Sequence, residues 1–179
     1  MSILPPRPFS TADLFHLVDM GLIDREARFE LIDGAIVPMS LKGRQHEIMR
    51  ERLAIWLKAP WAQAFNVLQE HTLALGEGLV IEPDFIVYEA GRRIADAPLT
   101  GADLRLVIEV ADRSLAFDLG AKAALYAAHG VHEYWVIDAV RIEAHSHRMA
   151  SAQGWDDLRK AVAGEDVAPL VAPSAPFRL

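Results

Sequence analysis

The chain has 179 residues, of which 52% are hydrophobic and 24% are charged, and it carries a net charge of −7 and no cysteine. This length and apolar share suit one domain with a substantial core, and the absence of cysteine excludes a disulfide scaffold, a thiolate zinc site and a cysteine nucleophile. The negative charge argues against a dedicated nucleic-acid binder, unless some acids hold divalent cations that supply positive charge at the site.

The N-terminal third predicts an extended arm followed by a helix, a hairpin and a second helix. Residues 1–9 contain three prolines and form the predicted arm. A helix is expected to begin after Ser10, a typical N-cap residue, and to end before Gly21. Residues 28–39 predict two short strands joined at an Asp-Gly turn, and residues 45–58 have the apolar spacing of a helix.

The rest of the chain alternates apolar runs with turn residues. Strands are predicted at residues 66–75, 79–88, 104–110, 133–138 and 141–147, and a helix at residues 115–129. The order of elements predicts an α/β fold in which helices flank a mixed β-sheet. We expect a single domain over residues 1–179, with its core at residues 10–147 and an irregular tail at residues 163–179.

The sequence contains no membrane-spanning pattern. No apolar run is as long as the roughly 18 residues that a spanning helix needs. The first residues lack the basic and apolar regions of a signal peptide. A cytoplasmic protein is therefore predicted.

Two apolar strands each contain a carboxylate, Asp84 and Glu109. Aspartate is a poor strand former and an unpaired buried carboxylate is costly, so both need an explanation. Pro83 removes a backbone donor beside Asp84, which favours a bend there. If the strands are neighbours, both carboxylates can meet at one Mg²⁺ or Mn²⁺ ion, because hard cations prefer oxygen ligands. The alternative for Asp84 is an acid that caps a turn after proline.

The helix predicted after the second strand presents Asp118, Lys122 and Tyr126 on one face, because they are four residues apart. A lysine beside a metal-bound phosphate can stabilise developing negative charge. Lys122 can instead form an ordinary ion pair with Asp118, and Tyr126 can serve only as a packed residue. Two acids on strands and one lysine are the minimal parts of a metal-dependent phosphodiester hydrolase.

The segments at residues 28–40, 82–88 and 106–138, together with His46 at the start of a helix, resemble the Uma-two family of restriction endonucleases in the PD-(D/E)XK nuclease superfamily. The resemblance implies a restriction-endonuclease-like core and DNA as the substrate. It also implies that Asp84 and Glu109 are metal ligands, and that the backbone carbonyl of Val110 is a further ligand.

The resemblance departs from the superfamily motif at one position. The lysine expected two residues after Glu109 is replaced by Ala111, and Lys122 on the following helix is the matching candidate. Glu30 matches a family acid that completes the site from an earlier element. Arg113 stands where related sequences have a small polar residue or proline, so the loop around it is expected to differ.

His46, Arg113 and Tyr126 are the candidates for substrate binding. His46 either contacts phosphate or caps and packs the helix. The leading hypothesis is a Mg²⁺-dependent DNA endonuclease that acts as a homodimer, since cutting both strands of a duplex usually needs two sites. The alternatives are an inactive nuclease-fold binding or assembly module, favoured by the negative charge, and another metal-dependent phosphoesterase.

Overall fold

The computed structural model describes residues 7–24 and 26–179. Most of the arm predicted at residues 1–9 therefore lies outside the described residues. The chain forms two compact units: unit 1 comprises Met1–Met39 and Thr72–Glu82, and unit 2 comprises Ser40–His71 and Pro83–Leu179.

Unit 1 combines one helix with a four-stranded antiparallel sheet in the order β2-β1-β5-β4. Its elements are α1 (Thr11–Asp19), β1 (Phe29–Ile32), β2 (Ala35–Pro38), β4 (Leu73–Gly76) and β5 (Leu79–Ile81). Ser10 caps α1 as predicted. Its hydroxyl accepts from the backbone N–H of Asp13, and the Asp13 carboxylate accepts from the backbone N–H of Ser10. Leu14, Leu31 and Val80 form the core of this unit.

The predicted hairpin of unit 1 is confirmed. Its strands are β1 and β2, and the turn residues Asp33 and Gly34 have φ angles of 50° and 73°. Both angles lie in the left-handed region that a two-residue hairpin turn requires, which explains the Asp-Gly sequence. A Cβ atom on Gly34 would lie 2.3 Å from the Cβ of Pro8, so this turn also depends on the absence of a side chain.

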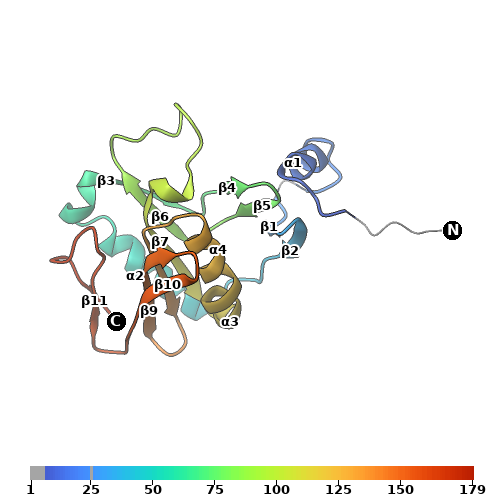
Figure 1. Cartoon of the computed structure of the whole chain (residues 1–179). Helices are drawn as coiled ribbons and strands as arrows, with labels where there is room; N and C mark the ends of the chain where they lie inside the picture. The colour runs from blue at the N-terminus through green and yellow to red at the C-terminus, as the bar shows by residue number, and fades with distance from the viewer. Residues whose placement is uncertain (1–6, 25) are drawn as a thin grey trace. The chain divides into compact units, whose positions relative to one another are not determined.

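Unit 2 is built on a six-stranded mixed sheet in the order β10-β9-β8-β7-β6-β3 (Figure 1). Its strands are β3 (Phe65–Gln69), β6 (Phe85–Glu89), β7 (Leu104–Ala111), β8 (Glu133–Asp138), β9 (Glu143–Ser151) and β10 (Gly154–Ala161). The pair β7–β8 is parallel and the other pairs are antiparallel. A parallel pair needs a crossover, which the helical segment at residues 115–128 supplies.

Helices cover both faces of this sheet. Helix α2 (Arg44–Trp56) packs Met49 and Leu53 into a core cluster that includes Ile108 and Trp135. On the other face, Tyr126 of the crossover helix packs against Tyr134 of β8, with 4.6 Å between the ring centroids. Short 3₁₀ helices, η1 (Pro60–Ala64) and η2 (Gly101–Asp103), connect the remaining elements.

Two predicted strands are each divided at the boundary between the units. The strand predicted at residues 66–75 is wrong as one element, because β3 belongs to unit 2 and β4 to unit 1. Glu70 has a φ angle of 49°, which turns the chain between them. The run at residues 79–88 divides into β5 and β6 around Pro83, where the predicted break in the ladder is confirmed.

The predicted helix at residues 115–129 is confirmed as a helical segment, but its middle is irregular. It consists of α3 (Leu115–Phe117), the π-helical turn η3 (Asp118–Lys122) and α4 (Ala123–Ala128). The N–H of Ala123 bonds to the carbonyl of Asp118, five residues earlier. Such π-turns occur frequently at functional sites, where the extra residue re-aims neighbouring side chains.

The C-terminal part contains structure that the sequence pattern did not predict. Strand β10 forms a long hairpin with β9. The segment at residues 163–179, expected to be irregular, holds a short antiparallel pair, β11 (Asp166–Val167) and β12 (Phe177–Arg178). Its buried Val167 and Phe177 join the core under α2, which explains why a segment without apolar periodicity is held in place. Within the described part of the chain, no helix has the length and apolar character needed to span a bilayer.

Candidate active site

Asp84 and Glu109 occupy neighbouring positions on paired strands of unit 2. Phe85 lies opposite Ile108 in the β6–β7 pair, so extending the register by one residue sets Asp84 opposite Glu109. Both residues are buried, with 5% of each exposed. The N–H of Val110 donates to Asp84 Oδ2 at 2.8 Å. The Asp84 carboxylate therefore satisfies a backbone donor of β7 at the point where Pro83 ends the ladder.

Two basic side chains hold the Asp84 carboxylate. Lys42 Nζ lies 3.1 Å from Oδ1, and His46 Nε2 lies 3.2 Å from Oδ2. Burial acts to raise the pKa of Asp84, but the hydrogen bond and charge of His46, the charge of Lys42 and the Val110 N–H outweigh it and lower the pKa to about 2. Asp84 is consequently ionised throughout the neutral range.

These contacts belong to a closed ring of alternating basic and acidic side chains. His46 Nδ1 lies 3.3 Å from Glu47, and Arg50 lies 3.1 Å from the other oxygen of Glu47. Arg50 also pairs with Glu70 at 3.2 Å, and Lys42 joins Glu70 to Asp84. The ring fixes the first turns of α2 to the ends of β3 and β6.

Glu109 has its own pair of donors from the crossover helix. Lys122 Nζ and the Tyr126 hydroxyl both donate to Glu109 Oε1, at 2.9 Å and 3.0 Å. Alternation along β7 explains the direction of this side chain, since Ile108 and Val110 face the core cluster under α2 and Glu109 faces the opposite side. The ion pair is buried, with 6% of each side chain exposed.

The π-turn brings Lys122 to this position. Asp118 begins the turn, and its carboxylate accepts from the hydroxyl of Ser114 at 2.5 Å. Its carbonyl accepts both the N–H of Ala123 and the hydroxyl of Tyr134, the latter at 3.1 Å. The helix is therefore anchored to β8 through Tyr134 at the same turn that directs Lys122 towards β7.

The structure brings the predicted residues together as two clusters. Asp84 contacts His46, and Glu109 contacts Lys122 and Tyr126. Across the described residues, no group of three or more His, Asp or Glu side chains is arranged to hold a metal ion. The meeting of Asp84 and Glu109 at one cation therefore stays a prediction. The donor chemistry fits a hard cation, because both residues offer carboxylate oxygens from adjacent strands.

Three further predicted residues have different surroundings. Glu30 belongs to β1 of unit 1, where it is buried and accepts from the backbone N–H of Glu82 at 3.0 Å. Arg113 is exposed in the loop after β7. Val110 contributes its N–H to Asp84, whereas the predicted role of its carbonyl as a ligand stays untested.

Sequence reasoning missed Lys42, Arg50 and Glu70, which hold the Asp84 side of the site. The signal for Arg50 was its position one helical turn from His46 and Glu47, on a helix that already carried a candidate residue. Lys42 lies in a loop before α2, and Glu70 at a chain reversal, so neither has a periodic pattern that points to Asp84.

Comparison with known proteins identifies the family and the fold of the chain. The model of the Uma2 family, described as "Putative restriction endonuclease", matches residues 12–174. A solved structure titled "a putative nuclease belonging to DUF820", from Anabaena variabilis, is similar over 96% of this chain and 95% of that chain, with 15% identity and a TM-score of 0.74. The type IIG restriction endonuclease BpuSI overlaps 65% of this chain and 14% of its own, with 14% identity and a TM-score of 0.41, which supports no inference. No protein with a curated description matches the chain.

The structural likeness to the Anabaena protein concerns the fold, because the identity is low. It confirms the predicted restriction-endonuclease-like α/β architecture. The family match spans nearly all of the chain and includes both carboxylate strands. The chain therefore belongs to the Uma2 family, whose description is "Putative restriction endonuclease".

Proposed function

We propose that the chain is a Mg²⁺-dependent endonuclease that hydrolyses phosphodiester bonds in DNA. The observation that carries the proposal is the β6–β7 pairing, which sets two buried carboxylates on adjacent strands with a basic side chain beside each. Asp84 and Glu109 would be the metal ligands, with the carbonyl of Val110 as a third. Mn²⁺ is the expected substitute because it accepts the same oxygen ligands.

The chain's own residues prepare the site for this chemistry. When bound, Mg²⁺ would lower the pKa of a water ligand and offset the charge of the scissile phosphate. Asp84 is ready to act as a ligand, because its pKa of about 2 keeps it ionised. The Tyr126 hydroxyl orients Glu109 from a fully buried ring. Lys122 supplies a positive charge beside Glu109, where the transition state gathers negative charge.

The substitution Lys122→Met tests the role of the lysine, since methionine keeps most of the length and loses the charge. We expect Mg²⁺-stimulated nicking of supercoiled plasmid to fall by about 100-fold or more, the usual cost of removing one electrostatic donor from a transition state. Lys58→Met, at an exposed position in the turn after α2, should nick at the wild-type rate. Full activity of a folded Lys122→Met protein would remove the lysine from the mechanism, and no nicking by wild type at any Mg²⁺ concentration would contradict the proposed function.

The alternatives make different predictions for the same protein. An inactive nuclease-fold module is favoured by the net charge of −7 and by the fact that basic side chains already compensate both carboxylates. Such a module should bind no Mn²⁺ in a calorimetric titration. Another phosphoesterase should bind Mn²⁺ but hydrolyse small phosphoesters in preference to DNA. A homodimer and a cytoplasmic location remain predictions.

A further inference from the structure

Strand β10 (Gly154–Ala161) is a long outer edge of the six-stranded sheet. It pairs with β9 on one side and is the last strand in the sheet order. Leu158, at its middle, is 65% exposed. An edge strand presents a row of backbone N–H and C=O groups that can pair with another strand. Eight residues extend over about 26 Å, which is long for an edge strand.

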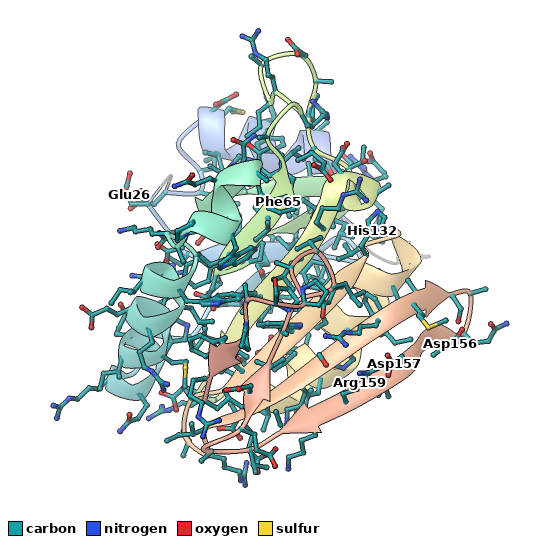
Figure 2. The ribbon with its side chains drawn as sticks, turned by 90° about the vertical axis from the view of Figure 1, so that its left-hand side faces the viewer. Glu26, Phe65, His132, Asp156, Asp157 and Arg159 are labelled. Carbon is teal, nitrogen blue, oxygen red and sulfur yellow. The ribbon has the colours of Figure 1, made fainter. Side chains whose placement is uncertain are left out.

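The charged residues of β10 lie at matching distances on the two sides of Leu158, with negative charges before it and positive charges after it. Asp156 and Asp157 precede this residue, and Arg159 and Lys160 follow it. Figure 2 labels Asp156, Asp157 and Arg159 along this strand. If two copies of β10 pair antiparallel with Leu158 opposite Leu158, Asp157 of each copy faces Arg159 of the other, and Asp156 faces Lys160. Opposite charges at facing positions stabilise an antiparallel pair, and like charges destabilise it.

We propose that β10 is a homodimer interface, in which two chains pair their β10 strands around a two-fold axis at Leu158 and join their sheets. A two-fold interface must be self-complementary, and this charge order meets that requirement without any change of register. Arg159 already contacts Asp157 of its own strand, with Nη2 2.9 Å from Oδ2. Pairing would place a second such ion pair beside the first, with alternating signs, and would cover Leu158 with its copy.

The opposite edge of the sheet lacks these features. Strand β3 has five residues, Phe65–Gln69, and none of them is charged. The competing explanation for the β10 charges is that they only prevent edge-to-edge association, a common role of charged residues on edge strands. That explanation requires no particular order of signs, so it can be separated from the proposal by changing the order.

The test is a charge exchange on the full chain, followed by sedimentation equilibrium over a range of protein concentrations. Wild type should show a monomer–dimer equilibrium. Asp157→Arg and Arg159→Asp should each weaken dimerisation by at least about tenfold, because each change creates facing like charges twice in a two-fold dimer. Mixing the two variants, or combining both changes in one chain, restores opposite signs and should restore the dimer.

A monomeric wild type at all concentrations, or single variants that dimerise as well as wild type, would overturn the proposal. A mixture of Asp157→Arg and Arg159→Asp that does not form the dimer would also overturn it, because dimerisation would then not depend on opposite charges at facing positions. Circular dichroism should be unchanged in all variants, because Arg159 is an exposed residue and Asp157 contacts it on the same strand.

A crosslinking experiment tests the register directly. The chain contains no cysteine, so Leu158→Cys introduces a single thiol. Facing residues in an antiparallel pair have Cβ atoms about 4.5–5.5 Å apart, which a small adjustment brings within disulfide range. Mild oxidation should give a covalent dimer of Leu158→Cys, whereas Leu170→Cys, on a residue that is 49% exposed outside β10, should remain monomeric. Equal crosslinking of both variants would contradict the register.

Discussion

Glu109→Gln is expected to reduce Mg²⁺-stimulated DNA cleavage by more than about 100-fold, because losing even an outer partner of a metal ligand costs about 10–100-fold and Glu109 would be a ligand itself. The change removes the charge that would hold the ion and also the partner of Lys122, which lies 2.9 Å from Oε1. The amide still offers an oxygen to the Tyr126 hydroxyl, so the shape of the site is largely kept. Plasmid nicking measured against Mg²⁺ concentration checks this expectation.

The matched control is the same substitution on an exposed acid of the neighbouring strand. Glu89 lies on β6 and pairs with Arg105 at the surface, so Glu89→Gln should cleave at the wild-type rate. If Glu109→Gln does not fold, Glu109→Asp keeps the charge, shortens the side chain and should show the same loss of cleavage. Wild-type cleavage by a folded variant at position 109 would exclude Glu109 as a ligand.

Glu133→Gln is expected to lower the free energy of unfolding by about 3–5 kcal/mol, the cost of breaking a buried ion pair and leaving one charge behind. Glu133 is fully buried and accepts from Trp135 Nε1, Arg148 Nε and the backbone N–H of Leu170, at 2.8, 2.8 and 2.6 Å. It therefore ties β8 to β9 and to the C-terminal segment. For a chain of this size the loss corresponds to a fall in Tm of roughly 6–20 °C.

Glu89→Gln again serves as the comparison, because its partner is a surface arginine. The side chains of Glu89 and Arg105 are 53% and 32% exposed, and such pairs contribute at most about 1 kcal/mol. Urea unfolding of both variants gives the two free energies. Similar values for Glu133→Gln and Glu89→Gln would show that the buried network contributes little to stability.

Local signals in the sequence predicted those elements whose ends are set by nearby residues. The start of α1 follows from Ser10 and Asp13, which satisfy backbone donors within one turn. The hairpin follows from Asp33 and Gly34, because few residues accept a positive φ. Strand β7 is apolar along most of its length since both of its faces are covered, which is the pattern of a central strand.

Features set by distant contacts could not be predicted in this way. The run at residues 66–75 has the composition of one strand, yet its halves join different sheets, because pairing partners far along the chain determine where each half lies. Strand β10 reads as a polar segment since one side of it is an exposed edge. Phe177 packs in the core without periodic neighbours, so the order in the C-terminal segment depends on tertiary contacts alone.

The candidate site was predictable at those residues whose type is unusual for the element that contains them. Asp84 and Glu109 stand out because carboxylates are costly in apolar strands, and Lys122 because it follows them on a helix. Lys42 and Glu70 do not stand out in the sequence, because charged residues are common in loops. The π-turn is likewise invisible in the helical pattern, because one extra residue in a single turn hardly changes the apolar spacing.

The proposed enzyme requires that Asp84 and Glu109 together hold one divalent cation. Crystals of the wild-type chain soaked in Mn²⁺ test it most directly, through anomalous density at the manganese absorption edge. We expect a peak within about 2.0–2.3 Å of oxygens from both carboxylates, with Lys122 either released from its direct contact with Glu109 or in contact with the new ligand shell. A fully loaded crystal with no peak there, or with manganese bound to only one of the two residues, would contradict it.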